Sequence, residues 1–272
     1  MLLKATFKNE IYEKTISENG FVAVRNFLSP EKTSTLLALY KQHHAIAESD
    51  AGMWNSMYNL SKDIAPQISQ SILATITPEL NDLFESYAAP VASFMSKNPN
   101  ELGICDLHRD FSILDESKFE YRNVWIPLVD ITLQNGALYA LAGSHKIFNY
   151  PLPMFCKWPY SHLQDKLDKH IDVFTVKAGD MVVYSDRTLH GSYLNKSQTS
   201  RPVIHLGALH PEYELAYYYL GPDNVVKIFE VPYSFFFENN FGDQTGRFPL
   251  LRSFLFEPPV INDLERTYAN HP

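Results

Sequence analysis

The most constraining feature of this chain is a rhythm of short apolar runs that begins near residue 103. The runs lie at 104–107, 122–128, 136–141, 172–176, 181–184 and 202–209. Turn-forming pairs punctuate them at Asn135-Gly136, Gly143-Ser144, Gly179-Asp180 and Asn195-Lys196. Each run is long enough to cross a sheet once, and the turn residues let the chain reverse direction. This pattern is typical of a β-sandwich or barrel, so the sequence predicts a mainly β core.

The residues before this core predict a helical flank with one strand. Phe21–Val24 is the strand candidate, and Ser29-Pro30 then resembles a helix N-cap followed by proline at the first helical position. Leu36, Leu37 and Tyr40 follow at helical spacing, which extends the helix to about residue 42. A second helix is expected to begin at Thr77-Pro78 and to end near Pro90.

We expect one domain over residues 1–272. Its parts would be the helical flank at 1–100, a β core at 101–210 and an aromatic extension at 211–272. A helical insertion is expected at 160–170, and the pattern after Leu220 assigns no secondary structure.

Composition excludes several classes of protein. The 31 acidic residues outnumber the 23 Lys and Arg residues, and no Lys/Arg run could form a stripe that neutralises phosphates, so we expect no nucleic-acid partner. No apolar stretch approaches the ~18–20 residues of a membrane helix, and the N-terminus is too mixed for a signal peptide. Two cysteines, Cys105 and Cys156, without metal-binding spacing indicate reduced, buried thiols in a cytoplasmic protein.

The tripeptide His108-Arg109-Asp110 is the first candidate for chemistry. On a strand, residues two apart point to the same face, so the imidazole of His108 and the carboxylate of Asp110 would converge. They would supply two thirds of the two-histidine-one-carboxylate site typical of non-haem Fe(II). Arg109 would point the opposite way, to make a surface ion pair or to reach a substrate carboxylate over the rim.

His190 is the best candidate for the third ligand, because it follows a turn and an apolar strand and precedes Gly191. Arg201 comes eleven residues later and opens the next apolar run. A planar guanidinium is a natural clamp for a distal carboxylate. A His-x-Asp, a distant His and an Arg at this spacing are together far more specific than any one of them.

Three segments of this chain resemble the phytanoyl-CoA dioxygenase-like branch of the Fe(II)/2-oxoglutarate-dependent oxygenases. The first, from Gly20 to Glu31, is similar to that family's N-terminal strand and helix start. The second is the Asn-Gly…Gly-Ser-His pattern from Asn135 to His145. The third is the distal-ligand segment from His190 to Arg201.

The resemblance implies a double-stranded β-helix, the cupin-like jelly roll of two antiparallel sheets. It implies His108, Asp110 and His190 as iron ligands and Arg201 as the residue that binds the far carboxylate of 2-oxoglutarate. It places Trp125 beside this cosubstrate. The implied reaction consumes O2 and 2-oxoglutarate, hydroxylates an aliphatic C–H bond of a small molecule, and releases succinate and CO2. Halogenating relatives lack the carboxylate ligand, so Asp110 favours hydroxylation.

Two other readings of the same residues stay open. One is a cupin-like metalloenzyme that does not use 2-oxoglutarate, and the other is a catalytically silent pseudo-oxygenase that acts as a binding protein. The sequence does not choose among amino acids, acyl thioesters, osmolytes and natural-product intermediates as substrates, nor between hydroxylation and desaturation. It leaves the oligomeric state open. His145 is interpreted as a hydrogen-bonded turn residue and His205 as a core histidine near the cosubstrate.

Overall fold

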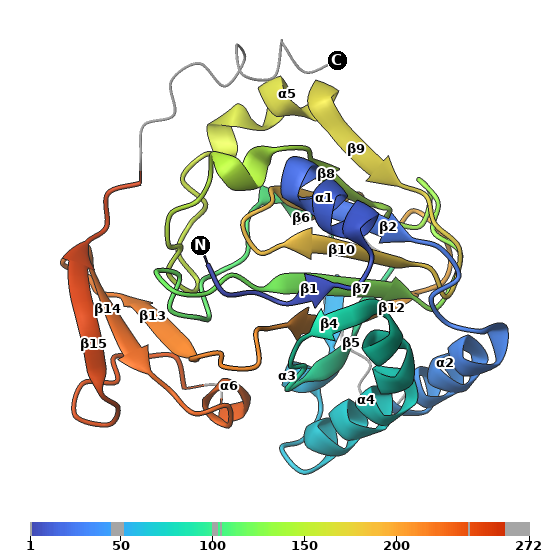
Figure 1. Ribbon diagram of the computed structural model, residues 1–272, viewed down its shortest axis with the longest axis horizontal. Coiled ribbons are helices and arrows are strands. Elements are labelled where there is room, and N and C mark those ends of the chain that lie inside the picture. Colours follow the sequence, from blue (N-terminus) through green and yellow to red (C-terminus); the bar gives the residue numbers. More distant parts are fainter. Residues whose placement is uncertain (1, 45–51, 100–102, 104, 239, 259–272) are drawn as a thin grey trace.

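The structure is a computed structural model that describes residues 2–44, 52–99, 103, 105–238 and 240–258 (Figure 1). The strands are β1 Thr6–Phe7, β2 Phe21–Val24, β3 Met53–Asn55, β4 Phe84–Ser86, β5 Ala92–Lys97, β6 Cys105–His108, β7 Arg122–Pro127, β8 Leu138–Leu141, β9 Ile171–Phe174, β10 Met181–Ser185, β11 His190–Ser192, β12 Arg201–Ala208, β13 Ala216–Leu220, β14 Val225–Glu230 and β15 Leu250–Leu255. The helices are α1 Glu10–Asn19, α2 Pro30–His44, α3 Ser56–Asn59, α4 Ile64–Leu83, α5 Gln164–Leu167 and α6 Phe235–Glu238.

Two antiparallel sheets form the core. The larger has the strand order β2-β10-β7-β12-β5-β3, and the smaller has the order β6-β11-β8-β9. Their inner faces share one apolar cluster, in which Trp125, Val182 and Val203 of the larger sheet join Leu138 and Ala140 of the smaller. The predicted mainly β, jelly-roll fold is therefore confirmed. All six predicted apolar runs contribute strands, although residue 104 lies outside the described part of the chain.

Strand alternation decides what the larger sheet presents to each side. In β7, Val124 and Ile126 belong to the outer cluster, while Trp125 belongs to the inner one. In β12, Ile204 faces outward in the same way and Val203 faces inward. The odd-numbered residues of both strands therefore point toward the smaller sheet.

Helices α2 and α4 cover the outer face of the larger sheet (Figure 1). The predicted helix after Ser29-Pro30 is confirmed as α2. The second predicted helix was placed wrongly. It begins at Ile64, contains Pro78 in its interior and ends at Leu83, because the apolar periodicity that buries Ile68, Ile72 and Ile76 starts well before the proline. The chain then continues as strand β4 rather than as helix to Pro90.

The flanking regions contain more strands than expected. The first hundred residues give β2, β3 and β5 to the larger sheet instead of a single strand. The unassigned tail forms an antiparallel sheet of β13, β14 and β15, beside the jelly roll in Figure 1. Aromatic side chains pack on both of its faces, so its sequence lacks the alternation that marks a half-exposed strand. The expected insertion at 160–170 is confirmed as short helical turns.

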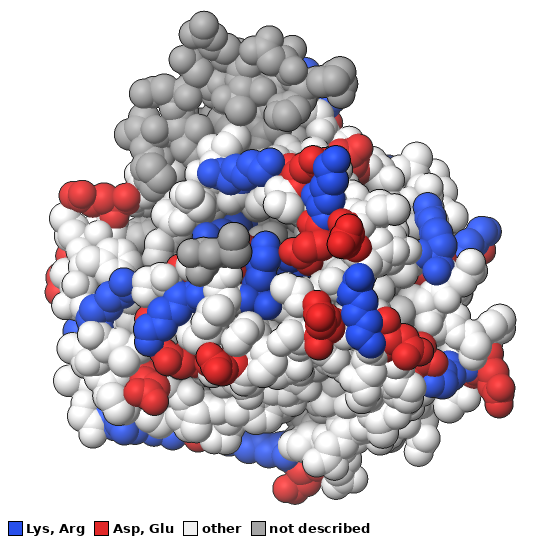
Figure 2. All heavy atoms as spheres, in the orientation of Figure 1, with Lys and Arg blue, Asp and Glu red and all other residues white. Residues whose placement is uncertain are grey.

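Charges of both signs are interspersed over the described residues on the face shown in Figure 2. Within the described part of the chain, no helix is both long and apolar enough to cross a bilayer.

Candidate metal centre and pocket

Two histidines meet at one end of the smaller sheet. His108 is the last residue of β6, His190 is the first residue of β11, and the two are paired directly across the antiparallel ladder. Their ring centroids lie 4.5 Å apart. The sheet register therefore brings together two residues that are far apart in the sequence.

Asp110 lies beside this pair, with its Oδ1 3.7 Å from Nε2 of His190. Candidate ligand atoms of His108, Asp110 and His190 all lie within 4.8 Å of one another. β6 ends at His108, so the predicted continuation of the strand to Asp110 is wrong. The Asp110 N–H instead donates to the carbonyl of Asp186 at 3.3 Å, and this contact helps to hold the loop that carries the carboxylate.

Backbone contacts orient both imidazoles for metal binding. Nδ1 of His108 lies 2.7 Å from the carbonyl oxygen of Asp106, and Nδ1 of His190 lies 2.9 Å from that of Thr188. A carbonyl only accepts hydrogen bonds, so each Nδ1 carries a proton, and in the neutral form of each ring Nε2 keeps the free lone pair. Two imidazole nitrogens and one carboxylate oxygen, the donor set that non-haem Fe(II) takes, therefore converge.

Protonation of the two histidines differs. Burial lowers the pKa of His190 to about 4, so this imidazole is neutral at pH 7 and available as a ligand. Burial would also lower the pKa of His108, but the neighbouring Cys105 thiol and the Asp110 carboxylate together raise it to about 10. A metal ion that binds at neutral pH must displace a proton from His108.

Arg109 does not reach the surface or the pocket rim, and the expectation of a surface ion pair was wrong. Its side chain is fully buried and pairs with Glu116 at 2.6 Å and with Asp186 at 3.7 Å. It also donates to the backbone carbonyls of Phe148 and Tyr150. The side of this segment opposite the triad is therefore a second buried region and is not exposed to solvent.

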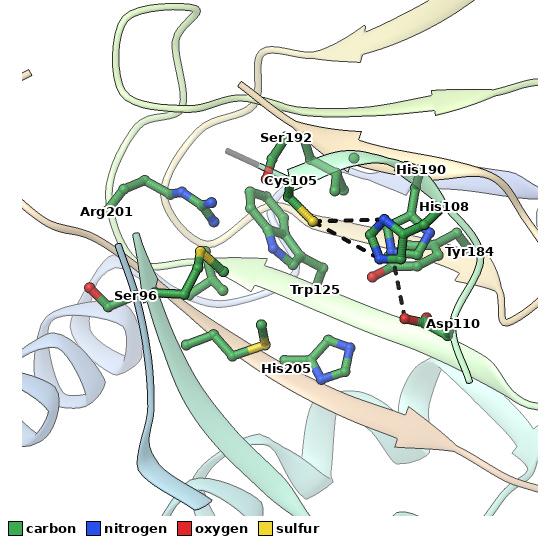
Figure 3. A pocket seen from close by; sticks show the side chains of 15 residues that line it. Ser96, Cys105, His108, Asp110, Trp125, Tyr184, His190, Ser192, Arg201 and His205 are labelled. Atoms are coloured by element: carbon green, nitrogen blue, oxygen red, sulfur yellow. Dashed lines mark hydrogen bonds and ion pairs between the residues drawn. The ribbon is translucent and has the colours of Figure 1, made fainter. Parts of the chain in front are cut away.

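The triad opens into a cavity of about 130 Å³ between the two sheets. Figure 3 shows the triad at one side of this pocket and Arg201 at the other, with Trp125 and Cys105 between them. Arg201 and Trp125 point inward because both occupy odd-numbered positions of β12 and β7. The remaining wall is largely apolar and includes Met53, Met95, Leu138 and Val203.

Arg201 is a buried cation that forms no ion pair with any carboxylate of the described residues. Its side chain is 3% exposed, and its Nε has no hydrogen-bond partner among the described residues. The guanidinium carbon lies 5.2 Å from the centre of the Trp125 ring, a cation–π contact that orients it. Burial lowers its pKa to about 10, and only Cys105 and Tyr184 oppose this effect. The site therefore fits an anionic group that would pair with Arg201.

The sequence did not predict several residues that line the pocket or contact the triad. Cys105 was interpreted as a buried core residue, but its thiol lines the pocket, with Sγ 3.7 Å from Nδ1 of His108. Both cysteines are free. Tyr184 also lines the pocket, with its ring 4.5 Å from that of His190. Asn123 donates from Nδ2 to Oδ2 of Asp110 at 2.6 Å. Its parity with Trp125 on β7 was the signal that could have revealed it.

His145 and His205, which the sequence analysis interpreted as non-ligands, lie outside the triad. His145 sits in a short 3-10 turn, with Nε2 3.2 Å from the carbonyl oxygen of Ser17, which confirms its interpretation as a hydrogen-bonded turn residue. His205 lines the pocket from β12, and its Nε2 lies 3.0 Å from Oδ1 of Asn123.

A jelly roll in which two histidines and a carboxylate converge defines the class of cupin-like metalloproteins. The chain belongs, more specifically, to the phytanoyl-CoA dioxygenase (PhyH) family, whose model matches residues 16–203. This confirms the resemblance found in the sequence. The predicted class of 2-oxoglutarate-dependent non-haem iron oxygenase agrees with this family membership.

Individual relatives are more distant. The chain is 27% identical over 150 residues to phytanoyl-CoA dioxygenase 1 of Oryza sativa subsp. japonica. The aligned segment covers 49% of this chain and 50% of the relative. The chain thus matches about half the length of that curated relative.

Two solved structures share the fold. One is the epimerase SnoN in complex with Fe3+, alpha ketoglutarate and nogalamycin RO, at 17% identity and a TM-score of 0.55 over 89% of this chain and 98% of SnoN. The other is HygX from Streptomyces hygroscopicus with nickel, 2-oxoglutarate and hygromycin B, at 14% identity and a TM-score of 0.55 over 75% of this chain and 88% of HygX.

Proposed function

We propose that this protein is an Fe(II)/2-oxoglutarate-dependent dioxygenase that hydroxylates an aliphatic C–H bond of a small organic molecule. The observation that carries the proposal is the buried guanidinium of Arg201 in the same pocket as the metal-ligand triad, because it pairs with no carboxylate of the described residues and its Nε has no hydrogen-bond partner among them. A buried charge without a partner destabilises the fold, so the free protein carries a cost that an anionic ligand would offset. A metalloenzyme that did not use 2-oxoglutarate would have no need of this cation.

His108, Asp110 and His190 would hold iron through two Nε2 atoms and Oδ1. Three protein ligands leave coordination positions open for the keto-acid end of 2-oxoglutarate and for O2. Arg201 would pair with the distal carboxylate at the other side of the pocket. Iron and 2-oxoglutarate together supply the oxidation: one oxygen atom enters succinate as CO2 leaves, and the other enters the substrate C–H bond.

The protein itself supplies placement and the exclusion of water. Trp125 packs against Arg201 and orients its fork toward the pocket. Tyr184 packs against His190, and the apolar side chains of Leu138 and Val203 line the space between the two sheets. Because these apolar side chains exclude water, they strengthen the Arg201–carboxylate interaction and keep water away from the reacting centre.

Hydroxylation is the reaction that the ligand set supports best, because the carboxylate of Asp110 occupies the position that halogenating relatives leave free. The two structural relatives contain nogalamycin RO and hygromycin B as small-molecule ligands. The pocket wall also includes Met53 and Met95. We infer a small organic substrate with an apolar portion that packs against this wall.

An anaerobic titration tests this proposal. Fe(II) and then 2-oxoglutarate are added to the metal-free protein, and the weak visible charge-transfer band of a keto acid chelated to ferrous iron is followed. We expect a band in the wild type that weakens in both Arg201→Ala and Asp110→Ala. A folded, iron-loaded protein without the band would overturn the 2-oxoglutarate assignment and favour the cupin-like alternative. A folded protein that binds no iron would favour the binding-protein alternative. Succinate release coupled to O2 uptake then identifies substrates.

A further inference from the structure

Two residues beside the triad form a hydrogen-bonded chain that ends on Asp110. Asn123 is 1% exposed on β7, and its Nδ2 lies 2.6 Å from Oδ2 of Asp110. Its Oδ1 lies 3.0 Å from Nε2 of His205 on β12. The residue directly opposite Asn123 on β12 is Gly207, which has no side chain, so the diagonal neighbour His205 can reach the amide.

The direction of every hydrogen bond in this chain is fixed by chemistry. An ionised carboxylate only accepts hydrogen bonds, so the amide NH2 of Asn123 must face Asp110 and its carbonyl oxygen must face His205. That oxygen only accepts, so Nε2 of His205 must carry a proton. Burial lowers the pKa of His205, with the Asp110 charge opposing, which favours the neutral ring. The other ring nitrogen, Nδ1, is then bare, and the ring borders the pocket.

The two carboxylate oxygens of Asp110 thus have different surroundings. Oδ2 is occupied by the Asn123 amide, whereas Oδ1 faces Nε2 of His190. If both oxygens bound the metal, Asp110 would consume a coordination position that a two-point ligand and O2 need. Holding one oxygen away from the metal keeps three positions open.

We propose that Asn123 and His205 are positioning residues that restrict Asp110 to one metal-facing oxygen, and that the same chain fixes His205 as a hydrogen-bond acceptor in the pocket. The proposal rests on the proposed metal centre. It does not depend on the use of 2-oxoglutarate, so its test uses metal alone.

The test is a titration of the metal-free protein with Co(II), followed through the d–d absorption bands that report coordination number. We expect Asn123→Leu, which keeps the volume but removes the amide, to weaken Co(II) binding by roughly 10- to 100-fold, as is usual when an outer partner of a ligand is lost. The intensity of the bands should fall as Asp110 becomes free to bind through both oxygens. Asn195→Leu is the matched control, since this buried asparagine donates only to backbone carbonyls away from the triad.

His205 provides a second pair of variants that keeps the proposal testable if Asn123→Leu does not fold. His205→Phe removes the donor to Asn123, whereas His205→Gln places an amide N–H close to the position of Nε2. We expect His205→Phe to weaken Co(II) binding and His205→Gln to restore it to within about threefold of the wild type. Wild-type affinity and spectra in Asn123→Leu and His205→Phe alike would overturn the positioning role.

The state of the His205 ring can be observed directly. Long-range ¹H–¹⁵N correlation spectra of the Zn(II)-loaded protein distinguish the two neutral tautomers from the cation, and His205→Gln assigns the signal. We expect a neutral ring with the proton on Nε2 at pH 7. A proton on Nδ1, or on both nitrogens, would overturn the second half of the proposal. A wild type that binds Co(II) with the expected spectra and variant effects but shows no keto-acid band would overturn the proposed use of 2-oxoglutarate and support the positioning role.

Discussion

Two buried arginines on opposite sides of the triad have opposite electrostatic surroundings. Arg109 lies behind β6, where Glu116, Asp186 and backbone carbonyls surround its guanidinium. Arg201 lies in the pocket, where Trp125 stacks on it but its Nε has no partner among the described residues. Both are at most 3% exposed. The difference teaches that burial of a charge does not by itself indicate function, whereas burial without a counter-charge does.

The region around Arg109 is a closed ion cluster. Arg187 pairs with the same Glu116 at 3.6 Å, and the Ser112 hydroxyl donates to it as well. Two cations and two carboxylates therefore balance within the fold. Burial raises the pKa of Asp186, with Glu116 acting in the same direction and Arg109 opposing. Such a cluster stabilises only while every member is present.

The first prediction is the largest in energy. Arg109→Met should lower the free energy of unfolding by about 3–5 kcal/mol, because it leaves the Glu116 and Asp186 carboxylates buried without their cation. Urea denaturation measures it. Lys118→Met is the control, since Lys118 pairs with Glu214 on the surface, where solvent screening leaves an ion pair little effect on stability. A loss below about 1 kcal/mol in Arg109→Met would show that the cluster is not the structural element we describe.

Lys97 is a further buried cation, whose surroundings are intermediate between those of Arg109 and Arg201. It is directly opposite Arg201 on β5, and its Nζ donates to the carbonyls of Ser192 and Tyr193 and to the Ser192 hydroxyl. These acceptors are neutral. Burial, reinforced by the charge of Arg201, lowers the pKa of Lys97 to about 7.

The second prediction follows from the direction of this shift. An unfolded lysine keeps its proton up to about pH 10.4, whereas the folded protein releases it near pH 7. The unfolded state therefore binds more protons between these values, and stability must rise with pH across that window. We expect the wild type to gain about 2–4 kcal/mol relative to Lys97→Met between pH 7 and pH 10. Parallel stability–pH curves for the two proteins would contradict this.

The third prediction concerns Arg201 itself. Arg201→Met should leave the free energy of unfolding of the ligand-free protein unchanged or slightly higher, since it removes a charge without a partner. The same change should weaken 2-oxoglutarate binding by roughly 100-fold, the loss of a charge-assisted pair of about 2–3 kcal/mol. Calorimetric titration of 2-oxoglutarate into the Ni(II)-loaded protein measures the affinity. If Arg201→Met unfolds as easily as Arg109→Met, the contrast between the two arginines is wrong.

The residues that line the pocket were predictable from the sequence, whereas the residues packed around them were not. His108, Asp110, His190, Arg201 and Trp125 were all predicted from motif spacing or resemblance, and the structure brings all five to one cavity. Their roles as ligands remain proposals that the titrations test. The alternation within β7 and β12 was readable, because each strand has one apolar outer face and one mixed inner face.

Contacts that depend on the register between strands could not be predicted from the sequence. Asn123 and His205 meet only because β7 and β12 pair with Asn123 opposite Gly207. Arg109 was misplaced because the strand ends at His108, a detail that the local pattern does not contain. The C-terminal sheet was missed because aromatic residues cover both of its faces, which removes the alternating signal.

The smallest effect should come from the ring that orients Arg201. Trp125→Leu keeps an apolar wall but removes the aromatic face that lies 5.2 Å from the guanidinium. A desolvated cation–π contact contributes about 1–2 kcal/mol. Because the bound carboxylate of 2-oxoglutarate also orients the guanidinium, only part of this energy is lost from binding. We therefore expect 2-oxoglutarate affinity to fall about 5- to 10-fold. Trp125→Phe retains a ring face and should lose less than threefold. If Trp125→Leu and Trp125→Phe bind equally well, the tryptophan acts only as a wall. The guanidinium is then oriented by its own burial, and the contrast with Arg109 depends on the missing counter-charge alone.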